Sequence, residues 1–328
     1  MEIVFWACTA ILCLYLSLLL DQEAFYPYTI PMHEPEHLVI RPPSEARSLL
    51  VRVVRGCNWN RCRFCGIYDL FGTPYSTRSL EEVLADIDAL AAMYGDIFRT
   101  AFIGDANPLD LDTDFLVKVL IRLRERFPRV ERVTSYARAS SLQKKSVEDL
   151  IAIHEAGLDR VHVGLESGSN RVLKIQMKGT SQKQLIEAGK KAIDAGMELS
   201  YYFLSGLGGR DLWEEHAMES AKVFTEVKPH FIRVRRLFIH PMSKLMEKVR
   251  SEDFREQTPE GTVIELRLLL ENIDAEGTTF TCDHANNFLP VHGTLNADKD
   301  KMLKMIDSFL ALPRHQKMAH YDSIPSVI

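Results

Sequence analysis

Short apolar runs alternate with amphipathic stretches along the chain from residue 49 to residue 240. The runs are rich in Val, Ile, Leu and Phe, and they predict six strands, at 49–54, 100–103, 130–136, 160–165, 199–204 and 231–238. Between them, apolar positions recur every three or four residues and predict helices at 80–94, 114–126, 146–156, 181–195 and 211–227. This alternation of strand and helix is typical of βα units built around a parallel sheet.

The number of these units limits the fold. A closed barrel has eight βα units in about 250 residues, and only six units lie between residues 49 and 240. We therefore predict an α/β fold, a partial (β/α)6 TIM-type barrel over residues 49–240. Residues 241–328 are expected to form a C-terminal extension that caps the barrel, with a helix at 259–273, a β-rich run at 278–282, a helix at 298–312 and a frayed tail after Pro313.

The N-terminal part does not fit the βα pattern. Residues 3–20 are apolar and uncharged, at the lower length limit for a helix that spans a membrane. Glu2 stands where a signal peptide has basic residues, and residues 21–23 are not a small-residue cleavage site. Residues 1–20 are therefore either a membrane anchor that leaves the rest facing the cytoplasm, or a hydrophobic extension from a mis-assigned start. Prolines throughout residues 21–48 predict an extended lead-in.

The composition is that of an ordinary soluble enzyme. The chain has 328 residues, is 46% hydrophobic and carries a formal net charge of -5. Because there is no basic surplus to neutralise phosphates, DNA binding is not expected.

Three of the six cysteines lie within nine residues, at Cys57, Cys62 and Cys65. An odd number of clustered thiols in a long chain indicates a metal or cluster site in a reducing, cytoplasmic compartment rather than disulfides. Their loop directly follows the first predicted strand, at the end of the barrel where active sites lie. The alternative is a zinc site of three cysteines and one histidine, with His284 as the fourth ligand.

The segment Gly56-Cys57-Asn58-Trp59-Asn60-Arg61-Cys62-Arg63-Phe64-Cys65 resembles the cluster loop of radical S-adenosylmethionine (SAM) enzymes, in which an aromatic residue precedes the last cysteine. That loop usually has three residues between the first two cysteines, and this chain has four. Residues 161–173 (VHVGLESGSNRVL) and 203–209 (FLSGLGG) are similar to the fourth and fifth strand ends of the branch that includes oxygen-independent coproporphyrinogen oxidases and tRNA-modifying relatives. The resemblance covers about residues 40–240.

The resemblance implies a 4Fe-4S cluster held by the three cysteines, with one iron left open, since iron–sulfur cubanes normally have four cysteine ligands. It implies that SAM chelates this iron and that an electron, from a reductant such as a flavodoxin or ferredoxin, cleaves SAM to methionine and a 5′-deoxyadenosyl radical. This radical would abstract hydrogen from an unidentified substrate, as in an iron–sulfur oxidoreductase or transferase. The SAM contacts that the resemblance implies or that the barrel position favours are Phe64, Ile67, Tyr68, Gly104, Asp105, Ser135, Glu166 and Gly206.

One of these contacts departs from the family pattern. The family's usual Gly-Gly-Glu at the second strand end is replaced by Gly104-Asp105-Ala106-Asn107-Pro108. Asp105 or Asn107 is a candidate substitute, and a turn built by Asn107-Pro108 explains the segment equally well.

Strand alternation predicts which side chains face the lumen, because the apolar face packs under the helices. On the fourth strand His162, Gly164 and Glu166 are expected to point inward, with His162 deeper, as a satisfied core group. On the sixth strand Arg233 and Arg235 share the lumen side, where paired guanidinium groups suit a small or anionic substrate. If their partners are carboxylates such as Glu166 or Asp105, they are scaffolding instead.

The run Cys282-Asp283-His284-Ala285-Asn286-Asn287 follows the β-rich stretch directly. His284 and Cys282 are candidates to donate a proton or a hydrogen atom. The alternative is turn chemistry that caps the barrel, since Asp and Asn are turn formers.

Two functions of different classes remain. The first is a radical SAM enzyme; the second is a non-catalytic cluster- or haem-handling protein on the same fold. Only Cys8, Cys13 and Cys282 remain outside the loop, which disfavours a second cluster and hence methylthio transfer.

Overall fold

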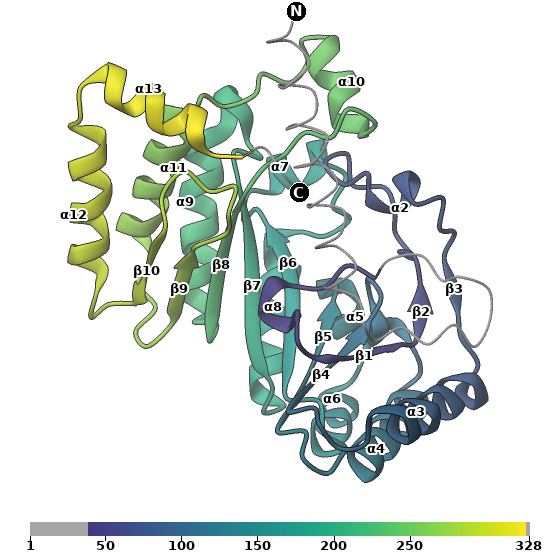
Figure 1. Cartoon of the computed structure of the whole chain (residues 1–328). Helices are drawn as coiled ribbons and strands as arrows, with labels where there is room; N and C mark the ends of the chain where they lie inside the picture. The colour runs from purple at the N-terminus through teal and green to yellow at the C-terminus, as the bar shows by residue number, and fades with distance from the viewer. Residues whose placement is uncertain (1–38, 326–328) are drawn as a thin grey trace, which may run out of the picture.

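The computed structural model describes residues 39–325 (Figure 1). The predictions for residues 1–20, and for residues 21–38 of the lead-in, lie outside this range. Within it, no helix is both long and apolar enough to cross a membrane.

One open, eight-stranded sheet forms the centre of the molecule, and its strands lie side by side in the order β1-β4-β5-β6-β7-β8-β9-β10 (Figure 1). All neighbours pair in parallel except β10, which is antiparallel to β9. The strands are β1 (Leu49–Arg52), β4 (Thr100–Gly104), β5 (Arg132–Ala137), β6 (Arg160–Glu166), β7 (Glu198–Ser205), β8 (Phe231–Arg236), β9 (Thr279–Cys282) and β10 (Val291–Thr294). Because β1 and β10 form the two edges, the sheet is a partial barrel, which confirms the predicted fold class.

The long helices follow the predicted pattern, and the short ones do not. The predicted helices are α3 (Leu80–Tyr94), α4 (Thr113–Arg126), α6 (Val147–Glu155), α8 (Gln182–Asp194) and α9 (Gly209–Val227). Helices too short for a periodic signal are α2 (Ile67–Leu70), α5 (Ala139–Lys144), α7 (Asn170–Ile175) and α10 (Lys244–Arg250), with 3-10 turns η1 (Pro43–Glu45) and η2 (Pro108–Asp110).

The two faces of the sheet have different roles. Residues such as Val161, Val163 and Val234 point toward the helices and belong to the main apolar core. The alternate positions define what we call the inner face. A row of rings crosses it from strand to strand: Phe102 lies 5.2 Å from Tyr136, Tyr136 lies 6.1 Å from His162, and His162 lies 6.0 Å from Tyr202, measured between ring centroids.

The C-terminal extension continues the sheet rather than standing apart from it. β9 pairs with β8, as the β-rich run predicts, and α11 (Pro259–Asn272), α12 (Lys299–Leu310) and α13 (Arg314–Ser323) gather at this edge (Figure 1). The prediction of a frayed tail after Pro313 is wrong. Pro313 precedes α13, whose Tyr321 is buried and packs 4.9 Å from the Phe288 ring.

A buried carboxyl group joins the extension to the barrel. Glu265 of α11 is fully buried, and its Oε1 accepts hydrogen bonds from Ser205 Oγ at 2.9 Å and from the Gly206 backbone N–H at 2.7 Å. Burial raises the pKa of Glu265 to about 8 and lowers the pKa of the neighbouring His216 to about 3. Both groups are therefore neutral near pH 7, and their 3.8 Å contact is not an ion pair at that pH.

These two shifts predict a stability loss between about pH 6.5 and pH 8. Over this range the native chain keeps a proton on Glu265 that the unfolded chain has released, so the free energy of unfolding falls by about 1.4 kcal/mol per pH unit. Below pH 6.5 the lowered pKa of His216 acts in the opposite direction and offsets this slope. Urea unfolding of Glu265→Gln should lack the loss, whereas Glu271→Gln, on the exposed side of α11, should retain it.

Candidate functional site

The cysteine loop has a closed stem. It leaves the sheet through β2 (Val54–Arg55) and returns through β3 (Ser76–Thr77), and the two strands pair antiparallel. Gly56 begins the loop with φ +69, and a Cβ there would lie 2.9 Å from the Thr73 carbonyl oxygen. Glycine is therefore required where the chain turns out of the stem.

Two short helices hold the loop from outside. The Trp59 indole N–H donates to the Met177 carbonyl at 2.8 Å, and the Arg63 backbone N–H donates to the Gln176 carbonyl at 3.0 Å, both just after α7. The Arg63 carbonyl in turn accepts from the Leu245 N–H of α10 at 2.8 Å. The loop geometry therefore depends on segments that are distant in sequence.

Asn107 belongs to a network that ties the loop to the sheet. Its Nδ2 donates to Asn58 Oδ1 at 3.2 Å, and its Oδ1 accepts from the Arg138 backbone N–H at 2.9 Å. Asn58 also donates to Asp110 at 2.7 Å. With Pro108 starting η2, the geometry matches the turn interpretation of this segment, and the Asn107 side chain is engaged in it.

The three cysteines are free thiols in partly buried positions. Burial raises the pKa of Cys65 to about 11 and also raises that of Cys62, and each sulfur lies within the electrostatic influence of the others. Across residues 39–325, the side chains of no three His, Cys, Asp or Glu residues are already arranged as a metal site. The donor set, three sulfurs on one short loop, fits an iron–sulfur cluster chemically.

Glu166 lies at the end of β6 beside an unpredicted partner, Lys178. Its Oε1 is 3.0 Å from Lys178 Nζ, and both side chains are largely buried. Burial lowers the pKa of Lys178, but Glu166 and the nearby Cys62 sulfur outweigh burial, so the pKa is raised. The ion pair therefore stands within the electrostatic influence of the cysteine loop.

The backbone makes room for this pair. A Cβ on Gly164 would lie 2.1 Å from Glu166 Oε1 and 2.8 Å from Lys178 Nζ. Glu166 itself has φ 61, a left-handed conformation that costs a non-glycine residue about 1 kcal/mol or more. The sequence thus holds Glu166 in an unfavourable backbone geometry, over the one residue type that can accommodate it.

The residues after Glu166 anchor this loop to α9. Ser167 Oγ lies 2.8 Å from His216 Nδ1, and the Gly168 backbone N–H donates to Ser220 Oγ at 2.7 Å. Ser169 caps α7 through the Val172 N–H at 3.1 Å. The Ser-Gly-Ser sequence therefore holds the loop in place, while Glu166 points to Lys178.

Asp105 is buried between two partners. Its Oδ1 accepts from the Tyr68 hydroxyl at 2.5 Å, and its Oδ2 lies 3.5 Å from an Arg52 guanidinium nitrogen. The preceding Gly104 is also buried, and a Cβ there would lie 3.0 Å from Val39. Ile67 begins α2, and its backbone N–H donates to the Cys65 sulfur. These four predicted contact residues therefore lie in buried or part-buried positions beside the cysteine loop.

Phe64 and Ser135 have different surroundings. Phe64 packs against a second apolar cluster that includes Leu207, Leu237 and Leu245, which connects the cysteine loop to the ends of β7 and β8. Ser135 Oγ donates within the sheet to the Ile103 carbonyl at 3.1 Å. Its neighbour Tyr136, rather than Ser135, joins the ring row of the inner face.

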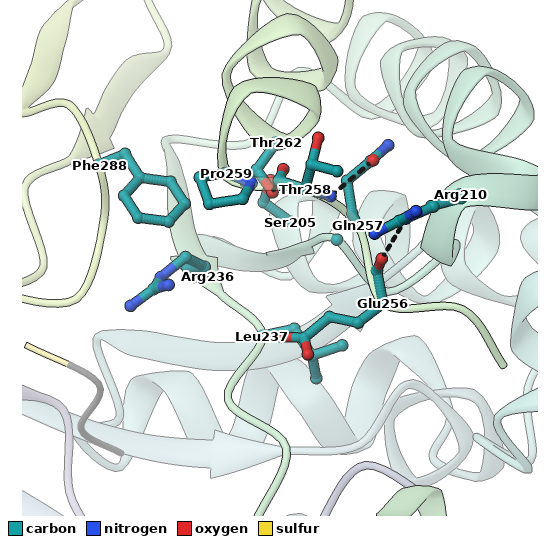
Figure 2. Close-up of a pocket in the computed structure, with 11 residues that line it drawn as sticks. Ser205, Arg210, Arg236, Leu237, Glu256, Gln257, Thr258, Pro259, Thr262 and Phe288 are labelled. Carbon is teal, nitrogen blue, oxygen red and sulfur yellow. Dashed lines mark hydrogen bonds between the residues drawn. The ribbon is translucent and has the colours of Figure 1, made fainter. Parts of the chain in front are cut away.

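Gly206 lines a pocket with a volume of about 330 Å³ at the ends of β7 and β8 (Figure 2). Arg210, Arg236 and the beginning of α11 complete this pocket, and Arg210 Nε donates to the Glu256 carbonyl at 2.9 Å. Gly206 has φ +86 and no atom within 3.7 Å of an added Cβ, so its backbone, rather than space, requires glycine.

The candidates beyond residue 230 separate into two groups. Arg233 and Arg235 lie on the inner face, and neither forms an ion pair with Glu166 or Asp105, whose cationic partners are Lys178 and Arg52. Cys282 is buried in the main core, where burial strongly raises its pKa.

His284 is part-buried, and its Nδ1 lies 2.6 Å from Asn286 Oδ1. Asn286 and Asn287 donate to the Arg236 and Val234 carbonyls at 3.1 and 2.8 Å. The segment therefore caps β8, as the turn interpretation predicts. Within residues 39–325, His284 does not join the cysteines in a metal-binding group, so the structure gives the zinc alternative no fourth ligand.

The sequence analysis missed Lys178, Gly164 and Asn58. Lys178 follows Glu166 by twelve residues, and α7, which brings it back, is too short to have a periodic signal. Gly164 was assigned to the inner face without a reason for being glycine, and that reason is the Glu166–Lys178 pair.

Comparisons with known proteins agree with this arrangement. A family model described as the radical SAM superfamily matches residues 51–221. An uncharacterized methyltransferase of Pyrococcus horikoshii is 28% identical over 157 residues, which cover 48% of this chain and 32% of that protein. A tRNA-2-methylthio-N(6)-dimethylallyladenosine synthase of Chlorobium phaeobacteroides is 29% identical over 177 residues, 52% of this chain and 38% of that protein.

Among solved structures, coproporphyrinogen III oxidase from Escherichia coli, titled a radical SAM enzyme, aligns with a TM-score of 0.54 and 15% identity, over 68% of this chain and 51% of that one. This likeness shows the fold. The matched part of the chain spans about a third of the length of the first curated relatives, 35%, 32% and 23%.

Proposed function

The chain belongs to the radical SAM superfamily, and from that premise we propose that it is an enzyme that cleaves SAM reductively at a 4Fe-4S cluster and uses the resulting radical on a substrate bound over the inner face. When bound, the cluster and SAM supply a 5′-deoxyadenosyl radical, which is cofactor chemistry that the protein directs. The methylthio and tRNA activities in the relatives' names are not part of the proposal. The cysteines outside the loop do not suggest a second cluster.

Cys57, Cys62 and Cys65 are the proposed cluster ligands. They follow β1, at the carboxyl end of a parallel sheet, where partial and complete barrels place their active sites. Burial raises the pKa of two of these thiols, so ligation to iron would have to release their protons. The stem, the Asn58 network and the two short helices fix the loop before any cluster binds.

Glu166 and Lys178 are the proposed contacts for the amino acid part of SAM. This part carries one ammonium and one carboxylate group, and the pair offers the complementary charges close to the Cys62 sulfur. Because each residue already neutralises the other, the pair stays stable when no ligand is present. This placement of opposite charges beside a three-cysteine loop is the single observation that carries the proposal.

The remaining parts of the proposal concern the partners. The cluster needs an electron from a reductant such as a flavodoxin or ferredoxin. Phe64, Ile67, Tyr68 and Gly206 remain the proposed contacts of the adenosyl group, and Asp105 is proposed to act through Tyr68, which it orients.

An anaerobic assay separates this function from the non-catalytic alternative. The protein is reconstituted with iron and sulfide, reduced with dithionite and supplied with SAM, and 5′-deoxyadenosine is measured. The proposal expects product that depends on reductant and protein. A cluster-loaded protein that gives no product, with or without candidate substrates, would establish the cluster- or haem-handling alternative.

Lys178→Met is expected to weaken SAM binding about 10-fold, because a charge-assisted hydrogen bond contributes about 1.5 kcal/mol or more. The iron content should not change, since Lys178 ligates no metal. Lys178→Arg should recover part of the affinity, and Lys174→Met, on the exposed side of α7, should bind as the parent does. Equilibrium dialysis with labelled SAM measures all four proteins, and equal affinity of Lys178→Met and the parent would contradict the assignment.

A further inference from the structure

The inner face between β6 and β9 carries positive charge that no acidic residue neutralises. Arg233 and Arg235 stand two residues apart on β8, so both point to this face, and both are half-buried. Within the described range, no Asp or Glu oxygen lies within 4 Å of either guanidinium.

The carboxylates of this face are engaged elsewhere. Asp105 is paired with Arg52, and Glu166 with Lys178. Glu45, at the opposite end of the sheet, lies 3.4 Å from Arg132, 3.5 Å from His162 and 2.7 Å from Ser48 Oγ. The scaffolding interpretation of the arginines, with Glu166 or Asp105 as partner, therefore does not describe this structure.

The contacts that the arginines do make hold them without neutralising them. Arg233 Nε donates to Ser200 Oγ at 3.2 Å, and its guanidinium lies 5.5 Å from the Phe231 ring centroid. The Arg235 guanidinium lies 5.7 Å from the Tyr202 ring centroid. A guanidinium has five N–H donors, so most of them remain available on each residue.

Other hydrogen-bond donors surround Arg235. Burial raises the pKa of Tyr136 and Tyr202, which keeps both phenols protonated, and Arg235 acts on both. Burial together with Arg235 lowers the pKa of His284, which places that ring beside the guanidinium from the other side. Two half-buried cations with protonated phenols around them form an environment that favours an anion.

We propose that Arg233 and Arg235 bind an anionic group of the substrate, a carboxylate or a phosphate, and so orient the substrate on the inner face. The inference rests on the proposed function in taking this face as the substrate side. It assigns the substrate class and leaves the SAM contacts at Glu166 and Lys178 unchanged. The anion would be held at β8, and the rest of the substrate would extend along the ring row toward the cysteine loop.

The test uses anaerobically reconstituted full-length protein with SAM present, titrated calorimetrically with inorganic pyrophosphate in one arm and with citrate in the other. We expect saturable binding in at least one arm, and the arm identifies phosphate or carboxylate as the preferred anion. Arg235→Gln and Arg233→Gln should each weaken this binding about 10-fold or more, because a charge-assisted pair is removed. Arg236→Gln, on the same strand but facing the pocket of Figure 2, should not weaken it.

Formation of 5′-deoxyadenosine without substrate is measured on the same samples. Arg233→Gln and Arg235→Gln should retain it, since neither residue contacts the cysteine loop. Anion binding in a protein that makes no 5′-deoxyadenosine would sink the proposed function and leave the anion site standing. No saturable binding in either arm, or equal binding by the parent and both variants, would overturn the anion site.

Discussion

Cys62→Ala should lose both its iron and all reductant-dependent formation of 5′-deoxyadenosine, to the level of a control without protein. Removal of one of three thiolates leaves two cysteine ligands for a cluster that normally has about four. Neighbouring side chains cannot replace the lost sulfur, because no other His, Cys, Asp or Glu within residues 39–325 joins the loop as a metal-binding group. Iron and sulfide analysis, with chromatography of the product, measures both effects.

Cys282→Ala is the matched control for this experiment. Cys282 is also a buried thiol, but it lies on β9 in the main core. Its replacement should leave iron content and product formation at parent levels, with a destabilisation of about 1 kcal/mol from the small cavity. If Cys62→Ala retained full iron, the loop would not be the cluster site. If Cys282→Ala lost it, a fourth protein ligand would be indicated.

Gly168→Ala should destabilise the chain by about 3 kcal/mol, the upper range for overpacking a tight contact. A Cβ on Gly168 would lie 2.2 Å from the Glu219 carbonyl oxygen of α9, and backbone on both sides cannot yield as a flexible side chain does. The substitution also strains the hydrogen bond from Gly168 to Ser220. We therefore expect a lower unfolding midpoint, together with weaker SAM binding as Glu166 moves.

Gly66→Ala distinguishes this packing effect from a general intolerance of glycine substitution. A Cβ there would make an ordinary 3.5 Å contact with Ser243, and the Gly66 backbone has φ -118. Its unfolding free energy should stay within about 0.5 kcal/mol of the parent. Equal denaturation midpoints for Gly168→Ala and Gly66→Ala would show that the loop after β6 does not pack against α9 as described.

The strands, the long helices and the two faces of the sheet are predictable because they depend on local periodicity. Alternation at Val161, His162 and Val163 separates core from inner face in the sequence as in the structure. The position of the cysteine loop follows from the same pattern, since a loop after a parallel strand lies at the carboxyl end of the sheet. These features need no knowledge of distant contacts.

The partners of the site residues depend on distant contacts and could not be predicted in this way. Lys178 reaches Glu166 only because α7 reverses the chain between them. Arg52 is the partner of Asp105 across two strands, whereas the sequence analysis considered only Arg233 and Arg235. The tail after Pro313 was predicted to fray, because its few apolar residues show no clear face. The structure folds α13 through Tyr321 against residues brought from the β9–β10 region.

The central claim is that the three-cysteine loop holds a cluster with an iron that SAM can reach. The most direct measurement is electron paramagnetic resonance of the anaerobically purified, dithionite-reduced protein, with and without SAM, alongside metal analysis. The account predicts about four iron atoms per chain and a 4Fe-4S signal that changes when SAM is added. Stoichiometric zinc without iron, or a cluster signal that SAM leaves unchanged, would contradict it.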